Sequence, residues 1–277
     1  MAIIGDRAEL TILKLTTPGY FLDSESALGE VLLPRAEVNE ELTIGEKVSV
    51  FIYTDSADRP VATMRTPHIM PGKFACLKCV STTSIGSFME WGLAKDLFVP
   101  FREQTQRMEA GKNYVVFAYL DQASDRIVAS RRLNRHFSKE KPNYKVEQEV
   151  DLIVYAKTDL GYKAVINNEH SGVLFANEVF RKLAPGEQMK AYIRQVRPDG
   201  KIDLSLRPQG RSYIKDLETQ IQEELNVRGG HWELCDSSSP EDIKDALGVS
   251  KKAFKQATGA LFRQRKITIS KDGIRSV

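Results

Sequence analysis

Aromatic and cationic side chains occur close together in the middle of the chain. Phe88 and Phe98 lie in short apolar runs, and three arginines follow at Arg126, Arg131 and Arg132. Exposed rings can stack on nucleobases while guanidinium groups pair with phosphates, so this combination suits single-stranded nucleic acid. A second interpretation stays open, in which both rings only fill the interior of a domain.

Strand geometry bears on this choice. Neighbouring side chains of a strand point to opposite faces, so Phe88 and Met89 cannot both face the core. Phe98, between Leu97 and Val99, poses the same problem. Some of these side chains must face outward, and the pattern alone does not say which.

A second group of cations lies near the C-terminal end. Residues 251–277 contain eight basic residues and one acidic residue, Asp272. Helical spacing places Phe254, Ala257 and Leu261 on one face. Four cations fall on the opposite face: Lys252, Lys255, Arg263 and Lys266. With few acidic partners nearby, this face is suited to binding an anion, although a charged helix face can also be merely solvated or bind a protein.

The sequence gives little support to enzyme chemistry. The four histidines lie far apart and outside any nucleophile motif: His68, His136, His170 and His231. There is no Gly-x-x-x-x-Gly-Lys loop and no His-Glu-x-x-His motif, and the carboxylates show no paired spacing. We expect a protein without catalytic activity.

Cys76 and Cys79 form a Cys-x-x-Cys pair. A redox pair is typical of a helix N-terminus, whereas this pair lies in the strand-like run 74–81. A zinc site would need a second pair of ligands, and only His68 is near in sequence. We expect reduced thiols in a strand, no metal and no cofactor.

The elements that position these residues are repeated three times. A glycine begins each unit, at Gly19, Gly86 and Gly161. A second landmark follows at Pro34, Pro100 and Phe175, and a second glycine at Gly45, Gly111 and Gly186. The last two landmarks are 11 residues apart in every copy, which indicates internal repeats of one structural unit.

The first repeat predicts the structure of the unit. Its strand candidates are residues 9–16, 19–23, 30–33, 46–53 and 60–64. Five short strands in about 65 residues are typical of a small closed barrel, because closure removes exposed sheet edges.

We divide the chain into four domains, at residues 1–66, 67–135, 136–208 and 209–277. The first has 6 basic and 11 acidic residues, the second 10 and 6, and each of the last two 12 and 10. The acidic first repeat is therefore poorly suited to an anion and is the expected surface for any protein partner.

Composition changes after Arg211. Three serines can cap helices: Ser212, Ser239 and Ser250. We predict helices over 213–226, from 240 to Gly248, and over 251–264, followed by a hairpin that turns at Asp272-Gly273. Three helices and a hairpin are the order of a winged helix-turn-helix.

The N-terminal residues lack a basic segment followed by a long apolar core, which predicts no signal peptide. No apolar run approaches the roughly 20 residues needed to span a bilayer. We expect a cytoplasmic protein that does not bind membranes.

The motifs of the second repeat resemble a known RNA-binding repeat. Gly-x-Phe at 86–88, Phe-Val-Pro at 98–100, the turn from Asp121 to Arg126 and Val-Ala-Ser at 128–130 are similar to the repeat first described in ribosomal protein S-one. That family has a five-stranded OB-fold barrel. The resemblance implies contact with RNA through Phe88, Phe98 and Arg126.

The other two repeats depart from this pattern. Repeat one keeps Phe21 and Arg59 and has Leu32 at the second ring position. Repeat three has Lys163 and Val173 at the two ring positions. Three residues of repeat three are further candidates for contact with RNA: Tyr162, Phe175 and Lys201.

Over nearly its whole length the chain is similar to the conserved virulence factor B family of bacteria. The segments that carry this resemblance most specifically are Asp236-Ser-Ser-Ser-Pro-Glu-Asp-Ile and Ser250-Lys-Lys-Ala-Phe-Lys. It implies RNA binding linked to control of gene expression, including that of virulence.

Together these features predict a mainly β protein, three OB-fold barrels followed by a winged helix. We expect single-stranded RNA to lie along repeats two and three and to reach the basic helix. Two alternatives stay open: a DNA-binding transcriptional regulator that uses the winged helix, and a protein-docking scaffold.

Overall fold

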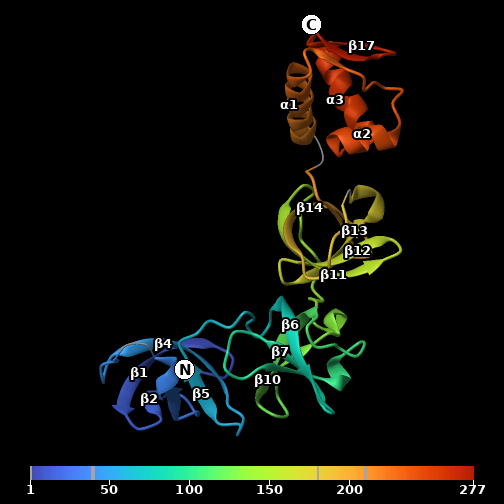
Figure 1. The fold of residues 1–277 in the computed structure, drawn as a ribbon. Coiled ribbons are helices and arrows are strands. Elements are labelled where there is room, and N and C mark those ends of the chain that lie inside the picture. Colours follow the sequence, from blue (N-terminus) through green and yellow to red (C-terminus); the bar gives the residue numbers. More distant parts are fainter. Residues whose placement is uncertain (1, 39–40, 180, 209–210) are drawn as a thin grey trace.

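The computed structural model describes residues 2–38, 41–179, 181–208 and 211–277. Three closed five-stranded barrels follow one another along the chain, and a helical domain completes it (Figure 1). The first two barrels lie side by side, and the third connects the second to the helical domain, so the chain is L-shaped. The predicted fold class is confirmed.

The barrels share one topology. The first consists of β1 (Arg7–Leu15), β2 (Gly19–Asp23), β3 (Glu30–Pro34), β4 (Lys47–Thr54) and β5 (Pro60–Thr63). The second consists of β6 (Phe74–Thr82), β7 (Gly86–Glu90), β8 (Leu97–Pro100), β9 (Asn113–Asp121) and β10 (Arg126–Ser130). The third consists of β11 (Glu149–Thr158), β12 (Gly161–Ile166), β13 (His170–Phe175), β14 (Gln188–Val196) and β15 (Ile202–Ser205). In each barrel the third and fifth strands pair in parallel and close the sheet.

The first glycine of each repeat is required by a close backbone approach. Gly19, Gly86 and Gly161 have φ values of 151°, 159° and 140°. A Cβ atom at any of them would clash with a carbonyl oxygen of the facing strand. The glycine therefore lets the start of the second strand lie in tight contact with the end of the third, which explains its recurrence.

An aromatic cluster joins the first barrel to the second. The Trp91 ring, in the loop between β7 and β8, meets the rings of Phe51 and Tyr53 from β4 edge-on, with centroids 6.0 and 6.3 Å apart. All three are buried in one continuous core that extends into the second barrel. Edge-to-face rings of this kind add to the stability that burial alone provides.

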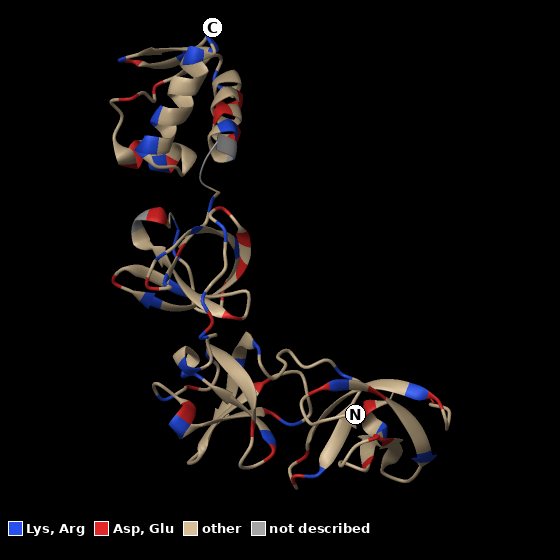
Figure 2. Cartoon of the chain, turned by 180° about the vertical axis from the view of Figure 1, so that it is seen from behind, with Lys and Arg blue, Asp and Glu red and all other residues tan. Residues whose placement is uncertain are grey.

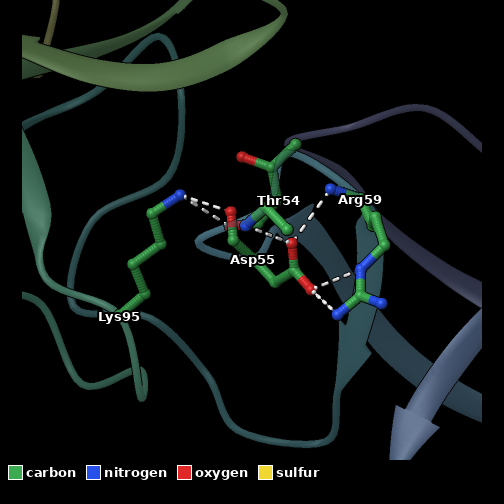
Figure 3. Close-up of polar contacts among 5 residues, drawn as sticks. Thr54, Asp55, Arg59 and Lys95 are labelled. Carbon is green, nitrogen blue, oxygen red and sulfur yellow. Dashed lines mark hydrogen bonds and ion pairs between the residues drawn. The ribbon is translucent and has the colours of Figure 1, made fainter.

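A lysine of the second barrel reinforces this joint. Lys95 Nζ donates hydrogen bonds to the carbonyl oxygens of Thr54 (3.2 Å) and Asp55 (2.7 Å) in the first barrel (Figure 3). The Asp55 carboxylate in turn accepts two hydrogen bonds from the Arg59 guanidinium, at 2.9 and 2.7 Å. The turn between β4 and β5 is thereby held against the second barrel.

A separate apolar cluster joins the second and third barrels. Phe74 from β6 stacks on Phe137 of the connecting segment, with ring centroids 5.0 Å apart, and the buried side chains of Ile153 and Val165 from the third barrel complete the contact. His136 stacks on Phe117, with centroids 4.3 Å apart. Three consecutive domains therefore share buried contacts.

The C-terminal domain is a winged helix with one strand that was not predicted from the sequence. Its helices are α1 (Arg211–Val227), α2 (Pro240–Leu247) and α3 (Lys251–Arg263). The hairpin of β17 (Ile267–Ser270) and β18 (Gly273–Ser276) gains β16 (His231–Trp232) as a third strand. Ser239 and Ser250 cap α2 and α3 as predicted. The prediction for Ser212 is wrong, because α1 already begins at Arg211.

Two further features concern membranes and thiols. Within the described residues, no helix is long and apolar enough to cross a membrane. Cys76 and Cys79 are free thiols in β6, as the strand-like run predicted. The described part of the chain contains no group of three or more side chains that could hold a metal ion.

Removing the Trp91 ring should destabilise the protein. Trp91 is 3% exposed, so Trp91→Ala should lower the free energy of unfolding by about 3–5 kcal/mol through lost burial and a cavity. Phe262→Ala is the control, because Phe262 is 53% exposed and its loss should change stability by less than about 0.5 kcal/mol. Urea denaturation of both variants measures the difference, and equal effects would contradict a structural role for Trp91.

Stability should also fall in mild acid because of His136. Burial lowers the pKa of His136, assisted by Arg135 and opposed by Glu103. The unfolded chain, with a histidine pKa near 6.5, then takes up a proton that the folded protein resists, so folding weakens as pH falls below that value. Thermal midpoints between about pH 8 and pH 5 should fall more steeply for the wild type than for His136→Gln. If the thermal midpoints of the two proteins fell equally with pH, His136 would not contribute to the loss of stability in acid.

Candidate nucleic-acid interface

The second barrel presents a pair of adjacent aromatic rings. Phe88 of β7 and Phe98 of β8 lie directly opposite each other in the strand register, with ring centroids 5.1 Å apart and planes tilted by 35°. Both rings are partly exposed, whereas Met89, Leu97 and Val99 are buried. The alternation that the sequence left open is thus resolved with both phenylalanines facing outward.

The arginine expected beside these rings has an ion-pair partner from another domain. Arg126, at the start of β10, pairs with Asp58 in the turn between β4 and β5 of the first barrel. The hydrogen bond from Arg126 lowers the pKa of the Asp58 carboxyl group. The first barrel therefore neutralises the cation that the sequence assigned to phosphate binding in the second.

The other two predicted arginines lie elsewhere. Arg131 and Arg132 line a pocket of about 450 Å³ that is built from residues of the second and third barrels, and neither Phe88 nor Phe98 lines it. The structure thus separates the rings of the second barrel from two of the cations that the sequence grouped with them.

The third barrel has a large basic groove. It has a volume of about 1010 Å³, and three predicted residues line it: Lys163, Phe175 and Lys201. Tyr162 does not, because its ring is buried and its hydroxyl accepts a hydrogen bond from the Leu183 amide at 3.4 Å. Tyr162 therefore belongs to the core of the barrel.

Several cations of this groove were not identified from the sequence. Lys139 and Lys141, in the segment that connects the second and third barrels, line it, as does Arg197. The Arg197 guanidinium lies 5.7 Å from the centroid of the Phe175 ring and pairs with Asp203 at 3.0 Å. The high charge of the segment that contains Lys139 and Lys141 could have indicated these two lysines from the sequence. Arg197 lies beside them only in the folded barrel.

Lys163 stands at the structural position of Phe88. Lys163 pairs with Val173 two residues after the first glycine of its repeat, as Phe88 pairs with Phe98. Among the described residues, no carboxylate lies within ion-pair distance of Lys163. The third barrel thus offers charge at the position where the second offers a ring.

In the first barrel, the cations near the outward-facing side of the sheet form ion pairs with acidic residues. Lys14 lies over the Phe21 ring, 5.1 Å from its centroid, and pairs with Glu30 at 2.6 Å. Arg59 pairs with Asp55 at 2.7 Å. This arrangement leaves the face with rings and cations but little free positive charge.

Helix α3 has the predicted distribution of charge. Phe254, Ala257 and Leu261 are fully buried. The four cations predicted for the opposite face are all exposed, but only Lys252, Lys255 and Arg263 lie on α3, because the helix ends at Arg263 and Lys266 follows it. Figure 2 shows Lys and Arg along this helix. Phe262, which was not predicted as a site residue, adds an exposed ring.

Two protein families match parts of the chain. The family described as S1 domain matches residues 4–65 and 71–131, the first and second barrels. The family described as CvfB-like winged helix domain matches residues 219–275.

Curated relatives match nearly the whole chain. "Uncharacterized protein YitL" of Bacillus subtilis is 27% identical over 95% of this chain and 90% of its own length. Conserved virulence factor B of Staphylococcus aureus is 26% identical, with coverage of 98% and 95%.

One solved structure aligns with this chain over nearly the full length of both proteins. It is described as a multidomain protein with nucleic acid binding domains from Streptococcus pneumoniae, and it is 22% identical, with a TM-score of 0.45 and coverage of 99% of this chain and 98% of its own.

Proposed function

The chain belongs to the conserved virulence factor B family, and from this premise we propose that it is a non-catalytic, cytoplasmic RNA-binding protein that regulates gene expression after transcription. S1 barrels and winged helices are both domain types that bind nucleic acid, so the domain content supports nucleic-acid binding. The preference for RNA and the regulatory role go beyond this and are our proposal.

The outward pair of Phe88 and Phe98 carries the proposal. Two adjacent partly exposed rings on a curved sheet offer successive stacking sites for unpaired bases. In a duplex the bases are already stacked on each other, so such rings favour a single strand.

Phosphate contacts would come mainly from the third barrel and the winged helix. Lys163 lines the groove of the third barrel, and Lys252 and Lys255 are exposed on α3. Lys201 also lines the groove but already pairs with Asp199 at 2.8 Å, so it contributes less than Lys163. Flexible lysines hold phosphates without reading sequence, so they fix the path of the strand and the bases contact the rings. Arg126 contributes less than the sequence suggested, because Asp58 already neutralises it.

The acidic first barrel would support the second rather than bind RNA. Its Asp55 and Asp58 lie in a turn that contacts Lys95 and Arg126 of the second barrel. We propose that this turn holds the second barrel in place and that its acidic charge discourages phosphates nearby.

Removing either ring should weaken RNA binding. Phe88→Ala and Phe98→Ala should each cost about 1–3 kcal/mol of binding free energy for a single-stranded oligonucleotide, because a stacked base loses its platform. Phe21→Ala is the matched control, since Phe21 stands at the same position in the first barrel and lies under Lys14. Fluorescence anisotropy measures all three, and equal affinities would exclude stacking at Phe88 and Phe98.

Removing Lys163 should change the salt dependence of binding. If Lys163 neutralises one phosphate, Lys163→Ala should reduce the slope of log K against log salt by about 0.7. Lys190→Ala is the control in the same barrel, because Lys190 already pairs with Asp151 at 2.7 Å. An unchanged slope for Lys163→Ala would place the strand outside the groove.

A comparison of nucleic acids tests the main alternative. The exposed lysines of α3 would also suit the groove of a duplex, as in a transcriptional regulator. At one salt concentration the proposal predicts tighter binding to single-stranded RNA than to duplex DNA. Tighter binding to duplex, lost in Lys252→Ala and Lys255→Ala, would favour the DNA-binding alternative, and weak binding to both would favour a protein-docking scaffold.

A further inference from the structure

The pocket at the joint of the second and third barrels has an unusual lining. Three arginines come from the segment after β10: Arg131, Arg132 and Arg135. Tyr114 comes from β9, and Tyr155 and Pro185 come from the third barrel. Among the residues that the structure describes, no aspartate or glutamate lines it. Its volume of about 450 Å³ falls in the range of roughly 300–1,000 Å³ that is typical of small-molecule sites.

The charge of Arg131 is incompletely compensated. Its guanidinium lies 4.5 Å from the centroid of the Tyr114 ring, and burial lowers its pKa. No carboxylate of the described residues is within ion-pair distance of it. The nearby Glu103 carboxylate accepts a hydrogen bond from the Ser130 hydroxyl at 2.7 Å instead. A cation that has lost water without gaining an anion favours an anionic ligand.

The neighbouring arginines can contribute to the same ligand. Arg132 Nε donates to the Arg102 carbonyl oxygen at 2.7 Å, which orients the guanidinium and leaves its terminal nitrogens without a hydrogen bond to the described residues. Guanidinium groups bind phosphate oxygens in a two-pronged geometry, so this pair suits a phosphate better than a single lysine would.

The walls of the pocket suit a flat ring. The Tyr114 hydroxyl accepts a hydrogen bond from the Glu109 amide at 2.9 Å, and the Tyr155 hydroxyl shares one with Ser171 at 3.0 Å. Both rings are thus fixed in place by their polar ends. Asn113 and Asn134 also line the pocket, and an asparagine side-chain amide can exchange hydrogen bonds with a base edge.

We propose that this pocket binds a nucleoside 5′-phosphate, with the phosphate on Arg131 and Arg132 and the base between the tyrosine rings and the asparagines. Such a unit comes from two sources, a free mononucleotide or the 5′-terminal nucleotide of an RNA. The second source rests on the proposed RNA binding, whereas the first is independent of it. Because both barrels line the pocket, a bound nucleotide would also strengthen their joint.

Calorimetric titration of the full chain with AMP, adenosine and inorganic phosphate tests the free source. A second titration compares one single-stranded RNA with a 5′-phosphate and with a 5′-hydroxyl. We expect AMP to bind more tightly than adenosine, or the 5′-phosphate to strengthen RNA binding, by roughly tenfold or more. AMP binding without RNA binding would support the pocket and contradict the proposed function.

Substitutions test whether the advantage of the phosphate depends on the pocket. Arg131→Met keeps an unbranched side chain over Tyr114 and removes the charge, so it should abolish the advantage of the phosphate. Arg107→Ala is the matched control, because Arg107 lies over the Phe101 ring at 5.5 Å in the same barrel and does not line the pocket. Circular dichroism confirms that each variant is folded.

Two results would overturn the inference. One is the absence of any advantage of phosphate in both titrations. The other is an advantage that Arg131→Met leaves intact while the variant is folded, or that Arg107→Ala removes equally.

Discussion

Every barrel depends on a close approach of its second and third strands, which glycine alone permits. A side chain at Gly19, Gly86 or Gly161 would clash with a carbonyl oxygen of the facing strand. This contact sets the register of the hairpin, and the register points the residue two positions later outward in each copy. The fold thereby presents one defined surface position three times, and the residue found there distinguishes the barrels.

The three barrels use that position differently. Phe21 lies under Lys14, which pairs with Glu30, so the first barrel offers a covered ring. The second barrel has the partly exposed pair of Phe88 and Phe98, with no cation lying over either ring among the described residues. The third replaces the ring with Lys163 at the edge of a basic groove. Under the proposed function, the three barrels would provide a support, a stacking surface and a charged groove for one flexible, negatively charged strand.

Local features of the fold could be predicted from the sequence, whereas contacts between domains could not. Alternation and turn residues located the strands, and serines located α2 and α3, because these signals lie within a few residues. The pairing of Arg126 with Asp58 joins residues 68 positions apart on different barrels, and no periodicity reports it. The burial of Tyr162, the position of Arg197 beside Phe175 and the short strand β16 likewise depend on tertiary packing.

Ultraviolet crosslinking of a bound single-stranded RNA, followed by mass spectrometry of the peptides, tests the central claim most directly. Phe88 and Phe98 should crosslink to bases, and further crosslinks should fall along the groove that contains Lys163. The first barrel, with Phe21 covered, should give none. Crosslinks confined to the first barrel, or a bound RNA that never crosslinks to Phe88 or Phe98, would contradict the account.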